Sequence, residues 1–259
     1  DHRDLHRVDR RQRQMCIRDR ACMVEVEGER TLAASCIREP TDGMVVSTNT
    51  DRAKSSRKMI MEMLLSDQPE ASISHDRSSH FWDMAKQNEI TESRLPKIEK
   101  DRIPLLDDSH LAMRVNLDAC IQCGLCVRAC REVQVNDVIG MSGRGHDAYP
   151  TFDLADPMGD STCVACGECV QACPTGALMP SKEIGKVIPD KKVDSVCPYC
   201  GVGCLLTYNI KDDKILFAEG RDGPANMSRL SVKGRYGFNY VNSEQRLSVP
   251  LARKEGATK

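Results

Sequence analysis

Apolar and polar residues alternate over residues 22–37, on both sides of a polar, glycine-containing turn at 27–29. Alternation of this kind around a turn predicts a β-hairpin. Residues 44–46 are apolar and are predicted to add a short strand. The segment before the hairpin, residues 1–20, has neither helical nor strand periodicity, and seven of its residues are arginine. We interpret this segment as a charged, disordered leader.

A helical period appears in residues 51–66, where apolar residues recur three and four positions apart. This pattern predicts an amphipathic helix. Four apolar residues are predicted to share its buried face: Met59, Ile60, Met63 and Leu64. We interpret the methionines as core-packing side chains, because flexible thioethers commonly fill irregular cores.

Residues 67–110 are mostly polar and contain no cysteine, and one short helix is predicted at 81–87. We interpret this region as a connector. Residues 205–210 and 214–218 alternate again around a polar turn, which predicts a second hairpin. The last residues, 246–259, have an extended pattern with no terminal element, and the chain is expected to be cut there.

Length and composition favour several small modules over one large core, since only 4% of the 259 residues are aromatic. A net charge of −1 gives no field that would attract nucleic acid or an anionic membrane. No segment approaches the roughly 18 consecutive apolar residues of a membrane span, and no apolar signal segment is visible. We therefore predict a cytoplasmic protein with no membrane span and no nucleic-acid partner.

Cysteine is the residue type that stands out, with 14 copies. A disulfide-rich secreted domain would be the ordinary explanation. The cysteines are instead clustered in runs, long cysteine-free stretches separate the runs, and no export signal is visible. Thiols in this pattern are more often metal ligands than disulfides.

Two of the runs repeat one another, CIQCGLCVRAC at 120–130 and CVACGECVQAC at 163–173. Their C-x2-C-x2-C-x3-C spacing is the sequence form of a two-cluster bacterial ferredoxin. Three thiolates of one tight loop can bind three corners of a [4Fe–4S] cubane, while the fourth, predicted at the start of a helix, faces the other cubane. The predicted ligand sets are Cys120, Cys123, Cys126 and Cys173 for one cluster, and Cys163, Cys166, Cys169 and Cys130 for the other.

Structural zinc is the alternative for these two runs. Zinc sites favour paired C-x2-C knuckles with four ligands, and two complete runs of four cysteines fit that arrangement poorly. Glycine and alanine within both runs would let backbone N–H groups approach the sulfurs and tune the clusters. We therefore predict two coupled [4Fe–4S] clusters, which carry one electron at a time and supply no chemistry of their own.

A third run, CPYCGVGC, contains Cys197, Cys200 and Cys204 in C-x2-C-x3-C spacing. Three thiolates are one short of the four that a cubane takes, so spacing alone leaves zinc or a partial cluster open. The two glycines of the run suit a loop that wraps around an inorganic core.

Residues 193–242 resemble the N-terminal cluster domain of the molybdopterin-guanine-dinucleotide oxidoreductases, which include formate dehydrogenases and nitrate reductases. In that family a fourth cysteine follows a strand pair and stands just before V/L-K-G. Here Ser231 has that position, within the matching sequence RLSVKGR. The resemblance implies a third cluster at this run, [4Fe–4S] or [3Fe–4S]. The serine could ligate iron through oxygen, cost the cluster an iron, prevent its assembly or be a sequence error.

Lys233 matches a lysine that lies between the cluster and the pterin in this family. The resemblance implies that Lys233 helps to relay electrons. A solvated surface charge is the alternative for a single lysine.

Residues 21–36 resemble the [2Fe–2S] domain of NAD-linked formate dehydrogenase catalytic subunits and of the large iron–sulfur subunit of respiratory complex I. The last two of that domain's four cysteines are separated by 13 residues, as Cys22 and Cys36 are. Asp19 stands where the preceding cysteine belongs, and Cys16 is out of register. The resemblance places a [2Fe–2S] cluster at Cys22 and Cys36, but two thiolates cannot fill four positions, so we expect none to form.

Complex I relatives also hold a cluster with one histidine and three cysteines after this domain. This chain has His75 and His80 there but no cysteine between Cys36 and Cys120, so both histidines are interpreted as surface residues. The order of the modules resembles a cytoplasmic, NAD-linked formate dehydrogenase alpha subunit more than a nitrate reductase.

The resemblance implies an α+β, multi-module protein. Its predicted segments are a leader unrelated to the family (1–20), a remnant of a β-grasp [2Fe–2S] ferredoxin-like domain (21–50), a helix and connector (51–110), a two-cluster ferredoxin domain (111–190) and a truncated N-terminal cluster domain of the bis-pterin enzymes (191–259). In the parent formate dehydrogenase, a molybdenum- or tungsten-bis-pterin site lies in further residues. Electrons would pass through the clusters toward a flavin- and NAD-binding iron–sulfur subunit. This chain alone is expected to be inactive with formate.

Three other interpretations stay open from the sequence. A stand-alone polyferredoxin-like carrier would differ only in the residues encoded after Lys259. A fragment of the complex I large iron–sulfur subunit is disfavoured by the missing histidine and cysteine cluster. A zinc-binding interaction module would contain neither iron nor sulfide.

Overall fold

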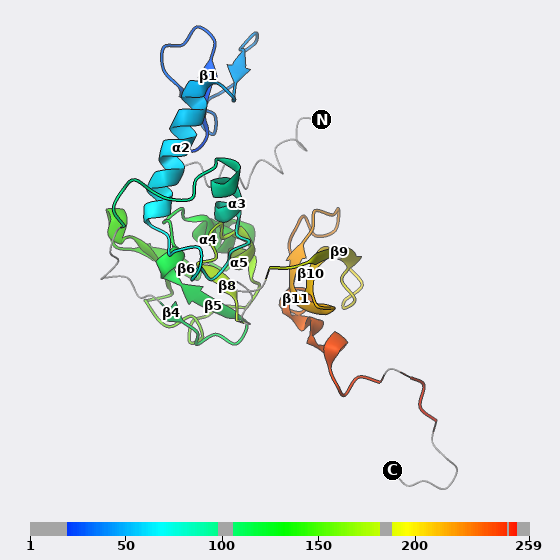
Figure 1. Cartoon of the computed structure of the whole chain (residues 1–259). Coiled ribbons are helices and arrows are strands. Elements are labelled where there is room, and N and C mark those ends of the chain that lie inside the picture. Colours follow the sequence, from blue (N-terminus) through cyan, green and yellow to red (C-terminus); the bar gives the residue numbers. More distant parts are fainter. Residues whose placement is uncertain (1–19, 98–105, 182–187, 248, 253–259) are drawn as a thin grey trace. The chain divides into compact units, whose positions relative to one another are not determined.

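The computed structural model describes residues 20–97, 106–181, 188–247 and 249–252. Most of the predicted leader therefore lies outside the described residues. The chain divides into two compact units, Asp1–Ile188 and Pro189–Lys259, which are described separately below (Figure 1).

The first unit begins with a small antiparallel sheet. Its strands are β1 (Met23–Val26), β2 (Ala33–Ala34) and β3 (Val46–Ser47), in the order β2-β1-β3. The predicted hairpin is confirmed by the β1–β2 pair, and the predicted third strand is confirmed only at Val46. Val24 and Val26 are buried while their neighbours are partly exposed, as expected of a strand with one face covered.

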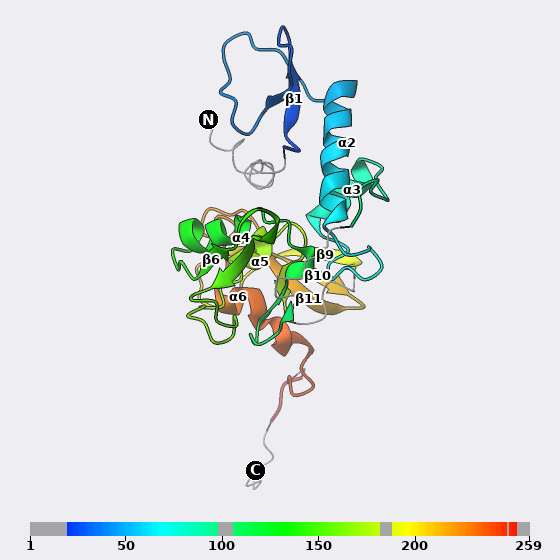
Figure 2. The same cartoon turned by 90° about the vertical axis from the view of Figure 1, so that its left-hand side faces the viewer.

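Two helices follow the sheet, α2 (Asp51–Ser66) and α3 (His80–Gln87). α2 has the predicted bounds, and it begins after Thr50, whose hydroxyl accepts a hydrogen bond from the Ala53 N–H at 3.3 Å. Figures 1 and 2 show β1 at one end of α2 and α3 beside the other end. Within the described ranges, no helix is both long and apolar enough to cross a membrane.

The predicted buried face of α2 is wrong at its two methionines, whereas Ile60 is half-buried and Leu64 packs against a buried cluster. Met59 and Met63 are 45% and 46% exposed, whereas Met61 is fully buried. Met61 packs into a cluster with three residues of α3 and the turn after it: Phe81, Ala85 and Ile90. Glu62 is buried as well, because Arg94 donates two hydrogen bonds to its carboxylate at 2.9 and 2.7 Å. The element that covers α2 decides its buried face, and the helical period alone did not reveal it.

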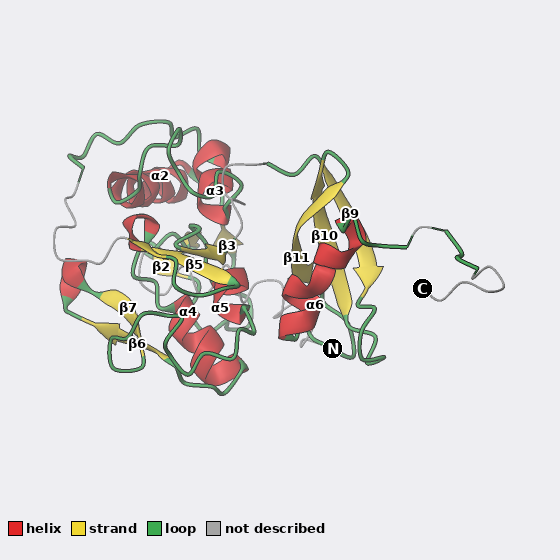
Figure 3. Ribbon diagram, turned by 90° about the horizontal axis from the view of Figure 1, so that it is seen from below, coloured by secondary structure: helices red, strands yellow, loops and turns green. Residues whose placement is uncertain are grey.

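The cysteine-rich part of this unit consists of two small sheets and two short helices. The elements are β4 (Leu106–Asp107), β5 (Met113–Asn116), α4 (Leu125–Arg128), β6 (Ile139–Ser142), β7 (Tyr149–Phe152), α5 (Glu168–Ala172) and β8 (Leu178–Pro180). β5 pairs antiparallel with β4 and β8, and β6 with β7. α4 and α5 contact each other, and Figure 3 shows them beside the β6–β7 hairpin. The buried side chains of this cysteine-rich part include Met113, Val115 and Met158.

The second unit is a three-stranded antiparallel sheet with one helix against it. The strands are β9 (Lys191–Val196), β10 (Leu205–Lys211) and β11 (Lys214–Gly220), and the helix is α6 (Val232–Tyr236). The predicted second hairpin is confirmed by β10 and β11, which turn at Asp212 and Asp213 with φ of 49° and 58°. Aspartate tolerates this left-handed conformation, which two-residue hairpin turns need. α6 packs against β11 (Figure 3).

Candidate metal centres

The two cysteine runs fold into nearly the same loop. Gln122 and Ala165, each just before the second cysteine, have φ of 52° and 56°, and the following Gly124 and Gly167 have φ of 72° and 69°. Positive φ costs a non-glycine residue free energy and persists only where the surroundings impose it. The sequence repeat is therefore also a repeat of an uncommon backbone conformation.

Each of these glycines is the N-cap of a short helix, so the third cysteine lies inside the helix and the fourth at or beyond its end. Cys173 is the C-cap of α5, and Cys130 lies in the π-helical turn Ala129–Val133 after α4. The prediction that the fourth cysteine starts a helix is therefore wrong. A left-handed residue cannot continue a helix but can precede one, and for this reason each helix begins before the third cysteine.

Backbone N–H groups point at three of the sulfurs. The pairs are Gln122 with Cys120 and Ala165 with Cys163, both at 3.4 Å, and Val138 with Cys130 at 3.3 Å. Hydrogen bonds to the charged form of a group favour that form. The loops are thus arranged to stabilise thiolates, and such bonds tune the potential of any cluster that the thiolates hold.

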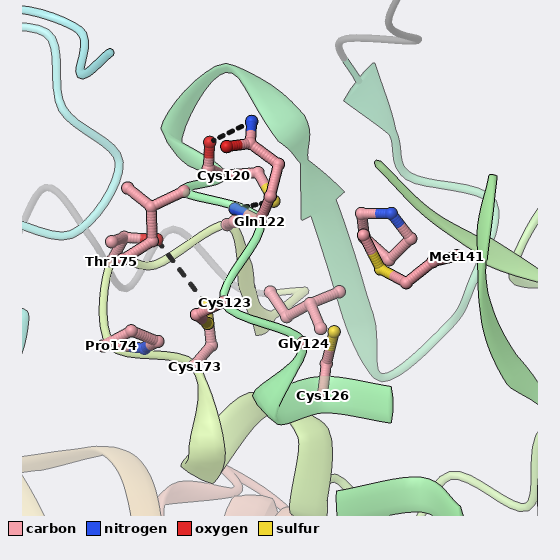
Figure 4. A pocket seen from close by; sticks show the side chains of 13 residues that line it. Cys120, Gln122, Cys123, Gly124, Cys126, Met141, Cys173, Pro174 and Thr175 are labelled. Carbon is pink, nitrogen blue, oxygen red and sulfur yellow. Dashed lines mark hydrogen bonds between the residues drawn. The ribbon is translucent and has the colours of Figure 1, made fainter. Parts of the chain in front are cut away.

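Four cysteines from both runs line one pocket: Cys120, Cys123, Cys126 and Cys173. Figure 4 shows three of them on the first run and Cys173 entering from the second, with Met141 of β6 also on the wall. The Thr175 hydroxyl lies 3.8 Å from Cys173 Sγ. The structure thus brings together the set predicted for one cluster. Thiols around a pocket suit a cluster of several atoms, whereas a single ion needs ligands that meet at one point.

The electrostatics of this pocket also favour cations. Burial raises the pKa of the Cys126 thiol well above its ordinary value, and four nearby sulfurs raise it further: Cys123, Cys120, Cys173 and Cys169. Thiols this close can ionise together only if positive charge lies between them, and metal binding releases their protons. Within the described ranges, no three His, Cys, Asp or Glu side chains have the geometry of a single-ion site.

Three cysteines of the second predicted set, Cys163, Cys166 and Cys130, interact electrostatically. Burial raises the pKa of the Cys163 thiol, the Ala165 N–H lowers it, and the charges of Cys166 and Cys130 raise it again. The effect of Cys130 places the fourth cysteine of the first run near the second loop. Cys130 and Cys169 are buried, at 7% and 5% exposed. The donor set of this second site also fits a [4Fe–4S] cluster.

The third run connects β9 to β10. The N–H of Cys197, just after β9, donates to the carbonyl of Cys204, just before β10, at 2.8 Å. Gly201 and Gly203 between them both have φ of 77°, and Cys200 lies exposed on the bend. Burial raises the pKa of the Cys204 thiol, followed by the charges of Cys197 and Cys200. Three thiols therefore lie near one another at the end of this sheet.

α6 begins beside this loop, at the predicted fourth ligand. A Cβ on Gly234 would lie 3.3 Å from Cys197 Sγ, so a glycine lets the helix approach the cysteine. Ser231 is the N-cap of α6, and its Oγ accepts a hydrogen bond from the Gly234 N–H at 3.3 Å. Serine is among the preferred N-cap residues. The serine oxygen thus has a structural partner, and the three thiols are the donors that fit iron. Lys233 is exposed on α6, and its relay role stays a prediction.

Asn226 supports this site and was missed by the sequence analysis. The side chain is 7% exposed, and its Oδ1 accepts a hydrogen bond from the Leu205 N–H at 3.0 Å. Its Nδ2 donates to three carbonyls at 3.0, 3.2 and 3.0 Å: Leu205, Arg221 and Arg229. Asn226 thereby ties a whole loop to the residue after Cys204.

Tyr199 is a second support inside the third run. Its hydroxyl donates to the carbonyl of Gly237, and its ring meets Tyr240 edge-on with centroids 6.4 Å apart. Burial raises the pKa of Tyr199, and the neighbouring Tyr240 and Cys197 add to the shift. No spacing rule reveals Asn226 or Tyr199, because both act between residues that are distant in sequence.

Cys22 and Cys36 lie beside each other on the first sheet. β1 and β2 pair at Met23 and Ala34, and the Ser35 N–H donates to the Cys22 carbonyl at 3.2 Å. The two Sγ atoms are 3.2 Å apart. Burial, followed by the hydrogen bond from Cys22, raises the pKa of the Cys36 thiol. A [2Fe–2S] cluster takes four protein ligands, and these two thiols alone do not fit one.

The remaining candidates are two residues of the leader and two histidines. Cys16 and Asp19 lie outside the described residues. His80 is exposed at the start of α3, and His75 is half-buried. The interpretation of both histidines as surface residues stays a prediction.

Three domain families match this chain. They are a 2Fe-2S iron-sulfur cluster binding domain over residues 2–51, a 4Fe-4S dicluster domain over 119–177 and a molybdopterin oxidoreductase Fe4S4 domain over 190–243. The three predicted kinds of module and the mixed α and β fold are confirmed. The first match begins inside the segment interpreted as a leader, and the boundary drawn at residue 21 stays a prediction.

The chain is similar to longer proteins. It is 32% identical to a subunit of an NADH-quinone oxidoreductase of Rhizobium meliloti and 30% identical to "Putative formate dehydrogenase YrhE" of Bacillus subtilis, over 92% and 91% of this chain. It spans 28% of the length of each of these curated relatives. A crystal structure of an NAD+-reducing [NiFe]-hydrogenase in the H2-reduced state matches with a TM-score of 0.58 and 25% identity, covering 66% of this chain and 72% of that one.

Proposed function

We propose that this chain, which matches a 2Fe-2S iron-sulfur cluster binding domain, a 4Fe-4S dicluster domain and a molybdopterin oxidoreductase Fe4S4 domain, is the electron-transfer region of an NAD-linked iron–sulfur oxidoreductase. The observation that carries the proposal is the pocket lined by Cys120, Cys123, Cys126 and Cys173. Iron–sulfur clusters held there and at the second run would supply one-electron transfer.

The residues of the chain hold and tune these groups. The two cysteine runs exchange their fourth ligands, so that each [4Fe–4S] site contains three thiolates of one loop and one of the other. Backbone N–H groups of Gln122, Ala165 and Val138 stabilise the sulfur charge. Cys197, Cys200 and Cys204 hold a third cluster, whose fourth position is not occupied by a thiolate.

The parent enzyme is a formate dehydrogenase in this proposal, with its molybdenum- or tungsten-bis-pterin site outside these residues. Relatives named as formate dehydrogenases and the likeness to an NAD+-reducing hydrogenase support the assignment. A flavin- and NAD-binding iron–sulfur subunit in the cytoplasm is the partner that would receive the electrons. The chain itself conducts electrons and does not react with formate.

The large iron–sulfur subunit of an NADH-quinone oxidoreductase is the second candidate. The 32% identity to a subunit of such an enzyme favours it. The region between Cys36 and Cys120 contains His75 and His80 but no cysteine, so it lacks the ligands of the additional cluster that the sequence analysis expected in complex I relatives. A stand-alone carrier of the polyferredoxin kind is a third candidate.

Iron and acid-labile sulfide per chain, measured on anaerobically purified protein, test the cluster content. About eight of each are expected if the dicluster region alone assembles, and about eleven to twelve if the third site is loaded as well. Iron near zero with bound zinc would overturn the proposal.

Activity assays on the complex purified through a tag on this chain distinguish the candidate parent enzymes. Formate-dependent formation of NADH is the expected activity. Oxidation of NADH by a quinone analogue, without any response to formate, would instead support the second candidate. A preparation that contains only this chain and its clusters would support the stand-alone carrier.

A further inference from the structure

The first sheet carries a pair of thiols that cannot serve the cluster of their domain family. Cys22 and Cys36 are two donors where a [2Fe–2S] cluster takes four, and Asp19 stands where a third cysteine would be. Their Sγ atoms are 3.2 Å apart. A disulfide has an S–S distance of about 2.05 Å, so the sulfurs need to approach by only about 1 Å, which side-chain rotation can supply.

The backbone around both cysteines is held in place. The Ser35 N–H and hydroxyl both donate to the Cys22 carbonyl, at 3.2 and 2.9 Å. On the other side of the bend, the N–H groups of Ile37 and Arg38 donate to the Ala34 carbonyl at 3.2 and 3.1 Å. These hydrogen bonds hold the backbone of both cysteines so that the two thiols lie beside each other.

The pair is also accessible. Both cysteines are partly exposed, as are most of the other described cysteines. A small disulfide in solution can therefore reach them. Exchange between thiols and disulfides needs such access to the sulfur that is attacked.

We propose that Cys22 and Cys36 form a reversible disulfide, so that this sheet carries a redox-active dithiol in place of a cluster. The oxidant is a low-molecular-weight disulfide of the glutathione class. One cysteine thiolate attacks it, which forms a mixed disulfide and releases one small thiol. The second cysteine then attacks the mixed disulfide, forms the Cys22–Cys36 bond and releases the second small thiol. The protein loses two electrons, the small disulfide gains them, and the two thiol protons end on the released thiols. This inference does not depend on the proposed electron-transfer function.

Peptide mapping tests the proposal directly, because trypsin cleavage after Arg20, Arg30 and Arg38 separates the two cysteines. The anaerobically purified chain is incubated in glutathione buffers of graded redox potential, trapped with acid and alkylated with N-ethylmaleimide after denaturation. The expected product links peptide 21–30 to peptide 31–38, is lighter than their sum by two hydrogen atoms, and disappears with dithiothreitol. The linked fraction should rise from near zero to most of the protein across the series.

Variants define which thiols react. Cys22→Ser should abolish the link and leave Cys36 as a mixed disulfide with glutathione. Cys16→Ser is the matched control and should leave the link unchanged, since Cys16 falls on a different tryptic peptide. Full alkylation of both cysteines throughout the series, or a link to Cys16 instead, would overturn the proposal. So would a [2Fe–2S] signal in the electron paramagnetic resonance (EPR) spectrum of the reduced protein that Cys22→Ser removes.

Discussion

The dicluster region (residues 119–177) and the third site (within residues 190–243) differ in the residue that stands at the fourth ligand position. Both place cysteines on a loop bent by glycines with positive φ. In the dicluster region, the fourth thiol at the pocket comes from the other run, as Cys173 does. In the third site, Ser231 has the corresponding position, and its oxygen caps a helix.

This difference separates what local spacing decides from what tertiary structure decides. Three ligands of a cluster can be set by one loop, because their spacing and its left-handed residues are local. The fourth ligand depends on a distant element that must arrive in the right place. Under the proposed assignment, the two runs of the dicluster region supply each other's fourth ligand, whereas α6 begins at the third site with the hydroxyl of Ser231.

The largest expected effect tests the exchange of ligands. Cys173→Ala should cost one cluster between one and four iron atoms, about one if the three remaining thiolates retain a [3Fe–4S] cluster and about four if the cluster is lost. The EPR spectrum that remains should match that of Cys120→Ala and differ from that of Cys163→Ala. A match to Cys163→Ala would show that each run keeps its own fourth cysteine.

A gain of iron at the third site is the next largest effect. Ser231→Cys supplies the fourth thiolate and should add about one iron if the site holds three, or about four if it is empty. Ser231→Ala is the control: it should add no iron and lower the free energy of unfolding by about 1 kcal/mol through the lost helix cap. Loss of iron in Ser231→Ala would instead identify the serine as a ligand.

Removal of the Asn226 side chain should disturb the third site without touching the dicluster region. Asn226→Ala deletes the partner of one N–H and of three carbonyls in partly buried surroundings, and the loss should lower the free energy of unfolding by about 1–3 kcal/mol. Thermal unfolding followed by circular dichroism should show the loss. Asn226→Asp keeps the acceptor but not the donors and should fall between the alanine variant and the parent, while iron from the dicluster region stays constant in both.

The smallest effect concerns the hydroxyl of Tyr199. Tyr199→Phe keeps the ring against Tyr240 and removes the hydrogen bond to Gly237, which should cost about 0.5–1.5 kcal/mol of unfolding free energy. Denaturant titration measures it. Tyr240→Phe keeps that hydrogen bond and serves as the control, with little change expected. No loss in Tyr199→Phe would mean that ring packing, and not the hydroxyl, supports the loop.

The sequence predicted the parts of this protein whose cause is local. The helix at 51–66 and the hairpin at 205–218 follow from apolar periods and polar turns, and the structure has both. The three cysteine runs were interpreted as cluster sites because their spacing is typical of iron–sulfur ligands. The sequence also predicted that Cys120, Cys123, Cys126 and Cys173 lie together, because the spacing rule for two-cluster ferredoxins takes the fourth ligand from the other run.

The features that the sequence did not predict depend on contacts across the chain. The buried face of α2 was only partly predicted because α3 packs against Met61 and Leu64, while Met59 and Met63 stay exposed. The fourth cysteine lies at the end of a helix because the positive φ of Gly124 starts that helix before the third cysteine. A glycine permits this conformation but does not require it, so the sequence did not predict it. The capping role of Ser231 and the four hydrogen bonds of Asn226 appear only once α6 and its preceding loop are folded against the sheet.

The pocket shared by the two runs has a consequence for synthesis. Cys120, Cys123 and Cys126 leave the ribosome well before Cys173, the fourth sulfur at their pocket. Under the proposed exchange, neither site is complete until the second run has emerged, and each then requires a segment of the other. Loading of either site with iron would accordingly begin only after synthesis has reached the second run, and a chain that stops before Cys163 would hold neither cluster.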